Sequence, residues 1–168
     1  MISNKIAGNI NEFLKESNAI EREYSNDALL DSMLAWNGLI ECDELNMSNL
    51  LLLHKRIMVN LSPDIAGNFR IVDVSVGTTR CPSPTTSLKL LNEWFDLYGT
   101  PKFLTGKVYQ EKAELIKLAH ISYEHAHPFE DGNGRTGRIL LNWHRVKSGL
   151  PVLIIHEGEE QKEYYKWF

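Results

Sequence analysis

The sequence predicts a mainly α-helical fold, and three observations support this prediction. Apolar residues recur three or four positions apart through most of the 168-residue chain, which is the spacing that places them on one face of a helix. Capping residues, glycine or proline stand at the ends of several of these stretches. A single stretch, residues 68–79, is instead rich in β-branched residues. We therefore expect a bundle of helices with one short hairpin.

Seven segments are expected to be helical. In chain order they cover residues 6–14, 26–40, 47–61, 85–98, 111–126, about 133–147 and 159–168. Asn26–Asp27 is the expected cap of the second segment, and Pro63 follows the end of the third. The expected apolar positions are Leu29, Leu30, Met33, Leu34 and Leu39 in the second segment and Leu50, Leu53, Ile57 and Met58 in the third.

Residues 68–79 interrupt the helical pattern. The stretch NFRIVDVSVGTT partly alternates apolar and polar residues and reaches Gly77 near its end. We predict a short hairpin at this position. An isolated hairpin in a helical protein is commonly a surface turn, so the pattern by itself assigns it no role.

The composition is that of an ordinary globular domain. At 168 residues the chain is long enough for one core, and we expect a single domain over residues 1–168. A net charge of −4 argues against a general nucleic-acid binder. Two cysteines are too few for a disulfide framework, and the longest apolar run is far shorter than the roughly 20 residues of a membrane span. With no recognisable signal peptide, these features predict a cytoplasmic protein that does not enter a membrane.

The most informative stretch is HPFEDGNGRTGR, residues 127–138, which we call the signature segment. It lies between two predicted helices, and the second helix begins near Asn133 or Gly134. The first amide groups of a helix have no intrahelical acceptor, so they form an anion site together with the helix dipole. Gly132 and Gly134 allow a close approach of the backbone to a phosphate. Asn133 tolerates a left-handed backbone and offers a side-chain donor.

Charged and titratable residues complete the signature segment. Arg135 and Arg138 are three residues apart on one helical face, where two guanidinium groups suit the phosphates of a nucleotide. Asp131 is placed to hold Mg²⁺ against those phosphates. His127, with an ordinary pKa of about 6.5, is a suitable base for a hydroxyl group near neutral pH. Each feature alone is commonly structural; their joint spacing predicts a site for a nucleotide triphosphate.

The other histidines are interpreted as structural or carry no motif. His120 and His125 precede His127, but no cysteine or further histidine follows at zinc-ligand spacing. His54, His144 and His156 stand in no recognisable pattern.

The signature segment resembles the pattern H-P-F-x-[D/E]-G-N-G-R-x-x-R of the Fic family, and every specified position is filled. The resemblance implies a Fic-type helical bundle with a β-hairpin flap over the active-site loop. Arg70, Val76 and Gly77 match residues of that flap, which in the family positions an extended target segment by strand addition.

A second resemblance concerns the N-terminal region. Many Fic proteins carry an inhibitory motif, [S/T]-x-x-x-E-[G/N], which Ser17 and Glu21 match. In the family this glutamate pairs with the second arginine of the signature, Arg138 by position, and blocks the γ-phosphate site. Arg22 departs from the expected glycine or asparagine. We expect residues 1–24 to carry the inhibitory segment and residues 25–168 to form the Fic core.

The resemblance implies a protein adenylyltransferase. Such an enzyme transfers AMP from Mg²⁺-bound ATP to a serine, threonine or tyrosine of a target protein, which includes the enzyme itself. Relatives that transfer phosphate or UMP, or that remove AMP, stay as alternatives. A catalytically inactive nucleotide-binding module, of a regulatory or toxin type, is a further alternative. The expected partners are ATP and a protein target; nucleic acid is not expected, and a homo-oligomer stays open.

Overall fold

The computed structural model describes residues 4–168, with side chains from residue 9 onward, and confirms a mainly helical fold with one small hairpin. The helices are α1 (Asn4–Ile20), α2 (Asn26–Ile40), α3 (Met47–Met58), α4 (Pro84–Tyr98), α5 (Tyr109–Ala126), α6 (Asn133–Lys147) and α7 (Glu159–Tyr165), with a 3₁₀ turn η1 (Pro101–Leu104). The strands are β1 (Ser75–Val76) and β2 (Thr79–Arg80). Within the described residues, no helix combines the length and the apolar character needed to cross a bilayer.

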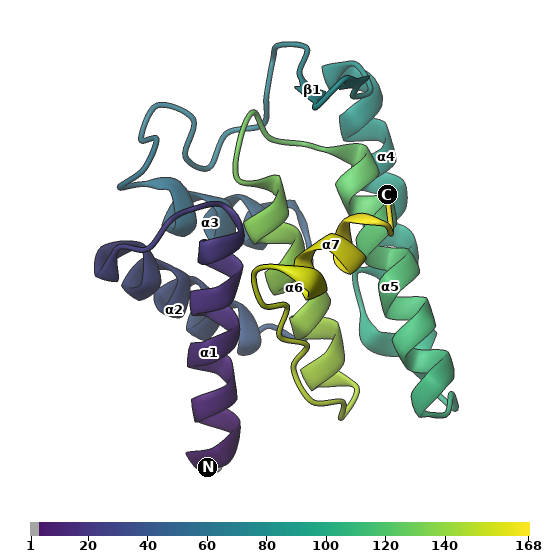
Figure 1. Ribbon diagram of the computed structural model, residues 1–168. Coiled ribbons are helices and arrows are strands. Elements are labelled where there is room, and N and C mark those ends of the chain that lie inside the picture. The colour runs from purple at the N-terminus through teal and green to yellow at the C-terminus, as the bar shows by residue number, and fades with distance from the viewer. Residues whose placement is uncertain (1–3) are drawn as a thin grey trace.

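Helix α6 lies at the centre of the bundle. It contacts α1, α2, α3 and α5, while α4 covers α5 and α2 pairs with α3 (Figure 1). Twelve of its fifteen residues are buried, and these include three arginines as well as apolar residues. The connection between α5 and α6 lies at the same end of the molecule as β1 (Figure 1). The signature segment therefore begins at that end and continues into the core.

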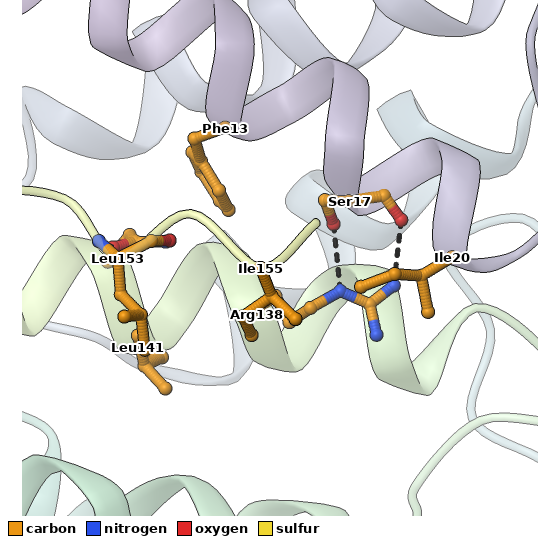
Figure 2. A pocket seen from close by; sticks show the side chains of 8 residues that line it. Phe13, Ser17, Ile20, Arg138, Leu141, Leu153 and Ile155 are labelled. Carbon is orange, nitrogen blue, oxygen red and sulfur yellow. Dashed lines mark hydrogen bonds between the residues drawn. The ribbon is translucent and has the colours of Figure 1, made fainter. Parts of the chain in front are cut away.

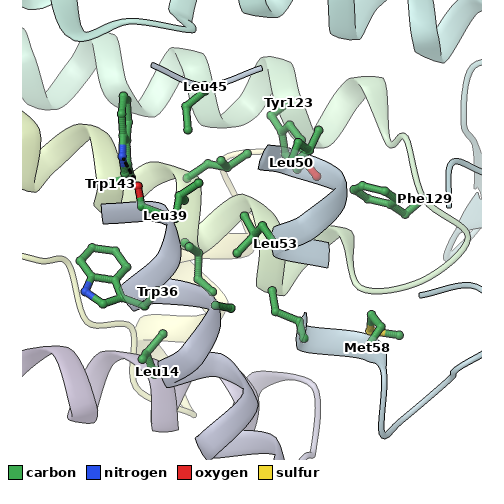
Figure 3. Packing of buried hydrophobic residues seen from close by; sticks show 14 of the residues in the cluster. Leu14, Trp36, Leu39, Leu45, Leu50, Leu53, Met58, Tyr123, Phe129 and Trp143 are labelled. Atoms are coloured by element: carbon green, nitrogen blue, oxygen red, sulfur yellow. Dashed lines mark hydrogen bonds between the residues drawn. The ribbon is translucent and has the colours of Figure 1, made fainter. Parts of the chain in front are cut away.

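The main apolar cluster holds α6 against the N-terminal half of the chain. Figure 3 shows Trp36, Leu39 and Trp143 packed together, and the indole N–H of Trp143 donates to the carbonyl of Leu39 at 3.1 Å. Phe129 lies in the same cluster and is fully buried. Because Phe129 belongs to the signature segment, core packing fixes the site directly.

Helix α2 has the expected bounds but a different buried face. Its cap is Ser25, which accepts from the backbone N–H of Ala28, and not Asn26–Asp27. Leu30 and Leu34 are 56% and 60% exposed. The buried residues are Ala28, Ser32, Ala35, Trp36 and Leu39. Because this helix is apolar on more than one side, spacing did not determine its inner face, and its buried side includes small residues that permit close packing.

The predicted hairpin is present, but it is shorter than expected and lies later in the chain. Ser75 pairs with Arg80 and Val76 with Thr79, so the ladder occupies only the last part of the β-branched stretch. Gly77 lies in the turn with a φ of 57°, which glycine adopts without strain. The residues before Ser75 are not paired in the ladder, and Arg70 fixes them by a different set of contacts.

Candidate active site

The signature segment forms the predicted helix, loop and helix. Helix α5 ends at Ala126, and α6 begins at Asn133. His127 has a left-handed backbone with a φ of 48°, and Gly132 has a φ of 78°. The left-handed backbone of His127 turns the chain away from the helix axis. Its N–H still donates to the carbonyl of Tyr123 at 3.1 Å, so the last turn of α5 is closed. This φ is strained for a histidine, so the surrounding contacts must stabilise the conformation.

The imidazole of His127 is half-buried and arranged to accept a proton. Its Nδ1 lies 3.3 Å from the carbonyl oxygen of Glu124. A carbonyl only accepts, so this contact requires hydrogen on Nδ1 and leaves the lone pair on Nε2. Burial lowers the pKa of His127 below its ordinary value, which keeps the ring neutral at physiological pH.

Arg70 fixes the backbone at His127 from the side of the hairpin. Its buried guanidinium donates to three carbonyls: Nε to His127 at 2.8 Å, Nη1 to Val72 at 2.9 Å and Nη2 to Pro82 at 2.5 Å. Its own N–H bonds to the carbonyl of Pro128. The matched flap arginine therefore acts inside the chain and joins the base of the hairpin to the signature segment, while Val76 is 57% exposed at the tip.

Asn133 corrects the sequence expectation. It is helical and buried, and its side-chain amide closes the loop by accepting from the N–H of Phe129 at 3.0 Å and donating to its carbonyl at 2.8 Å. One of its two amide hydrogens is used in this way, and the left-handed residue directly before α6 is Gly132, whereas Asn133 is helical. The structure thus gives Asn133 a role in closing the loop that the sequence did not indicate, and its part in binding phosphate stays a prediction.

Among the described residues, the N-terminus of α6 has unpaired amides where the sequence predicts an anion site. The first amides of the helix, from Asn133 onward, have no carbonyl acceptor one turn earlier within α6. A Cβ added to Gly134 would lie 2.7 Å from Oε1 of Glu21 and 2.9 Å from Nη1 of Arg138. Gly134 thus leaves room for a carboxylate and a guanidinium directly against the backbone.

Arg135 and Asp131 lie together beside these amides. Nη2 of Arg135 is 3.9 Å from Oδ2 of Asp131 and 3.2 Å from the sulfur of Met58, and the arginine is buried. The carboxylate of Asp131 is 65% exposed, and its Oδ1 accepts from the N–H of Gly132 at 2.6 Å. The described side chains offer no cluster of three or more metal-binding groups. One accessible carboxylate beside an anion site nevertheless fits Mg²⁺, which takes few protein ligands when phosphate and water supply the rest.

Arg138 contacts the N-terminal helix. Its Nε donates to Oγ of Ser17 at 2.9 Å, and its Nη2 donates to the Ser17 carbonyl at 2.9 Å and to Oε1 of Glu21 at 2.7 Å. Figure 2 shows the two contacts with Ser17. The apolar side chains around them, from Phe13 to Ile155, leave too little space for a water molecule. The structure therefore brings together Ser17, Glu21 and Arg138, as the resemblance implied.

Three further residues around Arg138 were not assigned to the site from the sequence. Tyr164 of α7 lies with its ring centroid 5.9 Å from the guanidinium carbon, and its hydroxyl is 2.9 Å from Nε2 of His120. Burial raises the pKa of Glu124 to about 7, and its buried Oε1 has no hydrogen-bond partner among the described residues. Glu124 and His120 are four residues apart on one face of α5, and that spacing was the signal the sequence offered for these two.

His54 is a fourth residue that the sequence left without a role. It belongs to α3, it is fully buried, and its ring is stacked on Phe129 of the signature segment. Its position between Leu50 and Ile57 on a buried helical face was the available signal.

Curated proteins with similar sequences are named as protein adenylyltransferases. The chain is 35% identical over 125 residues to the protein adenylyltransferase fic-1 of Caenorhabditis elegans, which covers 74% of this chain and 24% of the relative. It is 33% identical over 128 residues to the protein adenylyltransferase Fic of Drosophila erecta, covering 76% and 25%. The chain thus spans about a quarter of the length of these curated relatives.

Solved structures have the same fold. Fic-1 from C. elegans superimposes with a TM-score of 0.79 at 24% identity, covering 99% of this chain and 58% of that one. A Fic domain containing signaling protein from Bacteroides thetaiotaomicron gives a TM-score of 0.77 at 22% identity, covering 96% and 71%. The profile of the Fic/DOC family matches residues 44–144, which include the whole signature segment. With its signature, fold and family match in agreement, this chain belongs to the Fic/DOC family.

Proposed function

We propose that this chain is a protein adenylyltransferase, which transfers AMP from ATP to a hydroxyl side chain of a protein and releases pyrophosphate. The names of its curated relatives support this activity. The observation that carries the proposal is the juxtaposition within one segment of an accepting imidazole, His127, and the anion site at the start of α6.

The proposed reaction needs only groups that the segment supplies. Nε2 of His127 accepts the proton of the target hydroxyl as its oxygen attacks the α-phosphorus of ATP. The bond from the α-phosphorus to the bridging oxygen breaks, and pyrophosphate leaves. The α6 amides, Arg135 and Arg138 hold the triphosphate by charge-assisted hydrogen bonds, so positioning and electrostatics provide most of the rate enhancement.

Asp131 is the residue that would hold Mg²⁺. When bound, the cation neutralises phosphate charge and favours departure of pyrophosphate. Asp131 suits this task because its carboxylate is exposed, lies at the start of the anion site and is oriented by the N–H of Gly132.

The hairpin is proposed to position the target. Its two-residue strands expose all four of their residues, and they follow the segment that Arg70 attaches to His127. An extended target segment can add to such an edge through main-chain hydrogen bonds. The target is a protein with an accessible hydroxyl, and the enzyme itself is one candidate.

Glu21 is proposed to inhibit the transfer. Its carboxylate accepts from Nη2 of Arg138, a donor that a phosphate would otherwise use, and it lies against Gly134. A phosphate and a carboxylate cannot both use the same guanidinium edge, so ATP reaches a productive position only when Glu21 withdraws.

The test compares ATP labelled at the α- or at the γ-phosphate, with the purified parent chain, Glu21→Gly and His127→Ala, in the presence of Mg²⁺. We expect label on protein from the α-position only, most strongly in Glu21→Gly and absent from His127→Ala. Label from the γ-position would replace the proposal by phosphate transfer. No label from either would contradict it and favour another nucleotide, AMP removal or a binding module.

A further inference from the structure

His54 makes a specific contact on each side of its ring. Its Nε2 lies 2.9 Å from the carbonyl oxygen of Asp131, and its Nδ1 accepts from the N–H of Gly67 at 3.0 Å. The amide can only donate and the carbonyl can only accept, so the hydrogen must be on Nε2. One neutral ring therefore joins the loop after α3 to the residue expected to hold Mg²⁺.

The same ring supports the turn that follows Asp131. It is stacked on Phe129, with the ring centroids 3.6 Å apart and the planes within 2°. A Cβ added to Gly132 would lie 3.1 Å from Nε2 of His54 and 2.8 Å from the sulfur of Met58. His54 thus contacts the signature segment at three of the residues that lead into α6.

The carboxylate of Asp131 depends on its backbone for its orientation. It is 65% exposed, and among the described residues its close partners are the adjacent N–H of Gly132 and, at 3.9 Å, Arg135. An exposed side chain with these contacts points where its main chain directs it. The main-chain carbonyl of Asp131 is in turn held by Nε2 of His54.

We propose that His54 is a positioning residue for the nucleotide reaction: its Nε2–H holds the Asp131 carbonyl and so orients the Asp131 carboxylate and the first α6 amides toward a Mg²⁺-bound triphosphate. This inference rests on the proposed function. The required tautomer is fixed by the two contacts of the ring, because Nδ1 faces a donor and Nε2 faces an acceptor. A buried histidine with a purely structural role would stabilise the fold without any effect specific to Mg²⁺.

Two substitutions separate these roles. His54→Gln places an amide N–H near the position of Nε2 and loses the acceptor for Gly67. His54→Asn places an amide oxygen near Nδ1, keeps the acceptor for Gly67 and loses the donor to Asp131. Both remove the stacked ring, so each serves as the control for the other.

The experiment introduces each substitution into the Glu21→Gly chain. It measures urea unfolding, the affinity for ATP by calorimetry across a Mg²⁺ titration, and AMP transfer. We expect similar losses of stability in the two variants. We also expect His54→Asn to weaken Mg²⁺-dependent ATP affinity by about 10- to 100-fold relative to His54→Gln, the usual cost of losing a residue that orients a metal ligand. The rate of AMP transfer at low Mg²⁺ should fall in parallel.

Equal Mg²⁺ dependence in the two variants, or a larger loss in His54→Gln, would overturn the inference. If His54→Asn does not fold, His54→Gln decides alone, because the inference requires it to keep most of the Mg²⁺-dependent affinity of the Glu21→Gly chain. If the Glu21→Gly chain binds Mg²⁺ and ATP but transfers no AMP, the proposed function fails while the affinity comparison still tests His54. Absence of ATP binding by that chain would overturn both.

Discussion

Arg22 has a left-handed backbone, with a φ of 59°, where the inhibitory motif usually has glycine or asparagine. The backbone explains that preference. The N–H of Arg22 bonds to the carbonyl of Ala19 at 2.8 Å, and the N–H of Glu23 bonds to that of Asn18 at 3.0 Å, which is the Schellman ending of a helix. Arg22 therefore accepts the usual geometry, at a cost of about 1–2 kcal/mol for its Cβ.

Replacing Arg22 by glycine should stabilise the segment that holds Glu21 on Arg138. We expect Arg22→Gly to be more stable than Arg22→Ala by about 1 kcal/mol, since both lose the charge but only glycine loses the Cβ. We also expect less self-labelling in Arg22→Gly than in Arg22→Ala. Urea unfolding and labelling from α-labelled ATP measure the two effects. Equal values for glycine and alanine would show that the left-handed backbone does not limit inhibition.

At the residue scale, the sequence located the residues of the signature segment but not the contacts between their side chains and the backbone. His127 and Arg138 lie where the signature spacing placed them, because that spacing fixes a helix, a loop and a helix. The loop-closing role of Asn133 was missed, because bonds between its amide and the backbone of Phe129 cannot be inferred from residue types. His54 was missed, because Asp131 is 77 residues away in sequence.

At the scale of elements, the segment before the hairpin depends on Arg70. Its guanidinium spans the carbonyls of Val72, Pro82 and His127, so one side chain connects both ends of the hairpin region with the end of α5. No lysine can reproduce this, because an ammonium group lacks the rigid fork that reaches several carbonyls.

Arg70→Lys should therefore loosen the hairpin and the His127 backbone together. We expect the free energy of unfolding to fall by about 2 kcal/mol or more, because buried carbonyls lose charged donors. The control is Arg80→Lys: the side chain of Arg80 is exposed and, among the described residues, pairs with exposed Asp73, so the change should be within about 0.5 kcal/mol. Urea unfolding of both variants makes the comparison. Similar small effects would contradict the role of Arg70.

The existence of each helix was easier to predict than its buried face or its exact end. Helix α2 begins and ends at the predicted residues, yet Leu30 and Leu34 face outward. Helix α1 continues to Ile20, well past the predicted end at Leu14, because Ser17 and Ile20 are buried by distant parts of the chain. Local spacing determines that a helix forms, whereas its buried side depends on partners that the spacing does not identify.

At the scale of the whole molecule, three buried histidines support the packing of the bundle. Burial lowers the pKa of His54 and of His144 to about 4 and that of His120 to about 3. In the unfolded chain these groups bind protons below about pH 6.5, whereas in the folded chain they stay neutral. Their contribution to stability is therefore complete above pH 6.5 and is lost as the pH falls toward 4.

Stability should accordingly decrease on mild acidification. Each histidine contributes a slope of up to about 1.4 kcal/mol per pH unit. Glu124 acts in the opposite direction, because burial raises its pKa to about 7 and its protonated form favours the folded state as the pH falls. The net loss between pH 6.5 and 4.5 is then about 2–3 kcal/mol per pH unit at most. Urea unfolding at pH 7.0 and 5.5 measures it.

A substitution at His144 provides the control for this pH dependence. Its Nε2 lies 2.7 Å from the carbonyl of Tyr98, a contact that glutamine can keep without titrating. His144→Gln should therefore show a shallower dependence on pH than the parent chain. Stability that does not change between pH 7.0 and 5.5 would rule out the proton linkage.

The convergence on Arg138 is a property of the complete fold. Ser17 and Glu21 approach it from 121 and 117 residues away in sequence, and Tyr164 approaches it from the last helix. The family resemblance predicted the pairing with Glu21, but no spacing within the chain predicts a ring from α7 on the same guanidinium. Such contacts depend on distant parts of the chain, since Ile20 of α1 and Tyr164 of α7 belong to the same small apolar cluster.

The most direct test of the central claim, AMP transfer through His127 restrained by Glu21, is intact-protein mass spectrometry after incubation with Mg²⁺ and ATP. It compares the parent chain, Glu21→Gly, Glu23→Gly as the control carboxylate, and the double variant Glu21→Gly/His127→Ala. We expect Glu21→Gly to gain the mass of AMP to a much greater extent than the parent chain or Glu23→Gly, and the double variant to gain none. Equal gain in the parent chain and Glu21→Gly, or transfer that persists without His127, would contradict it.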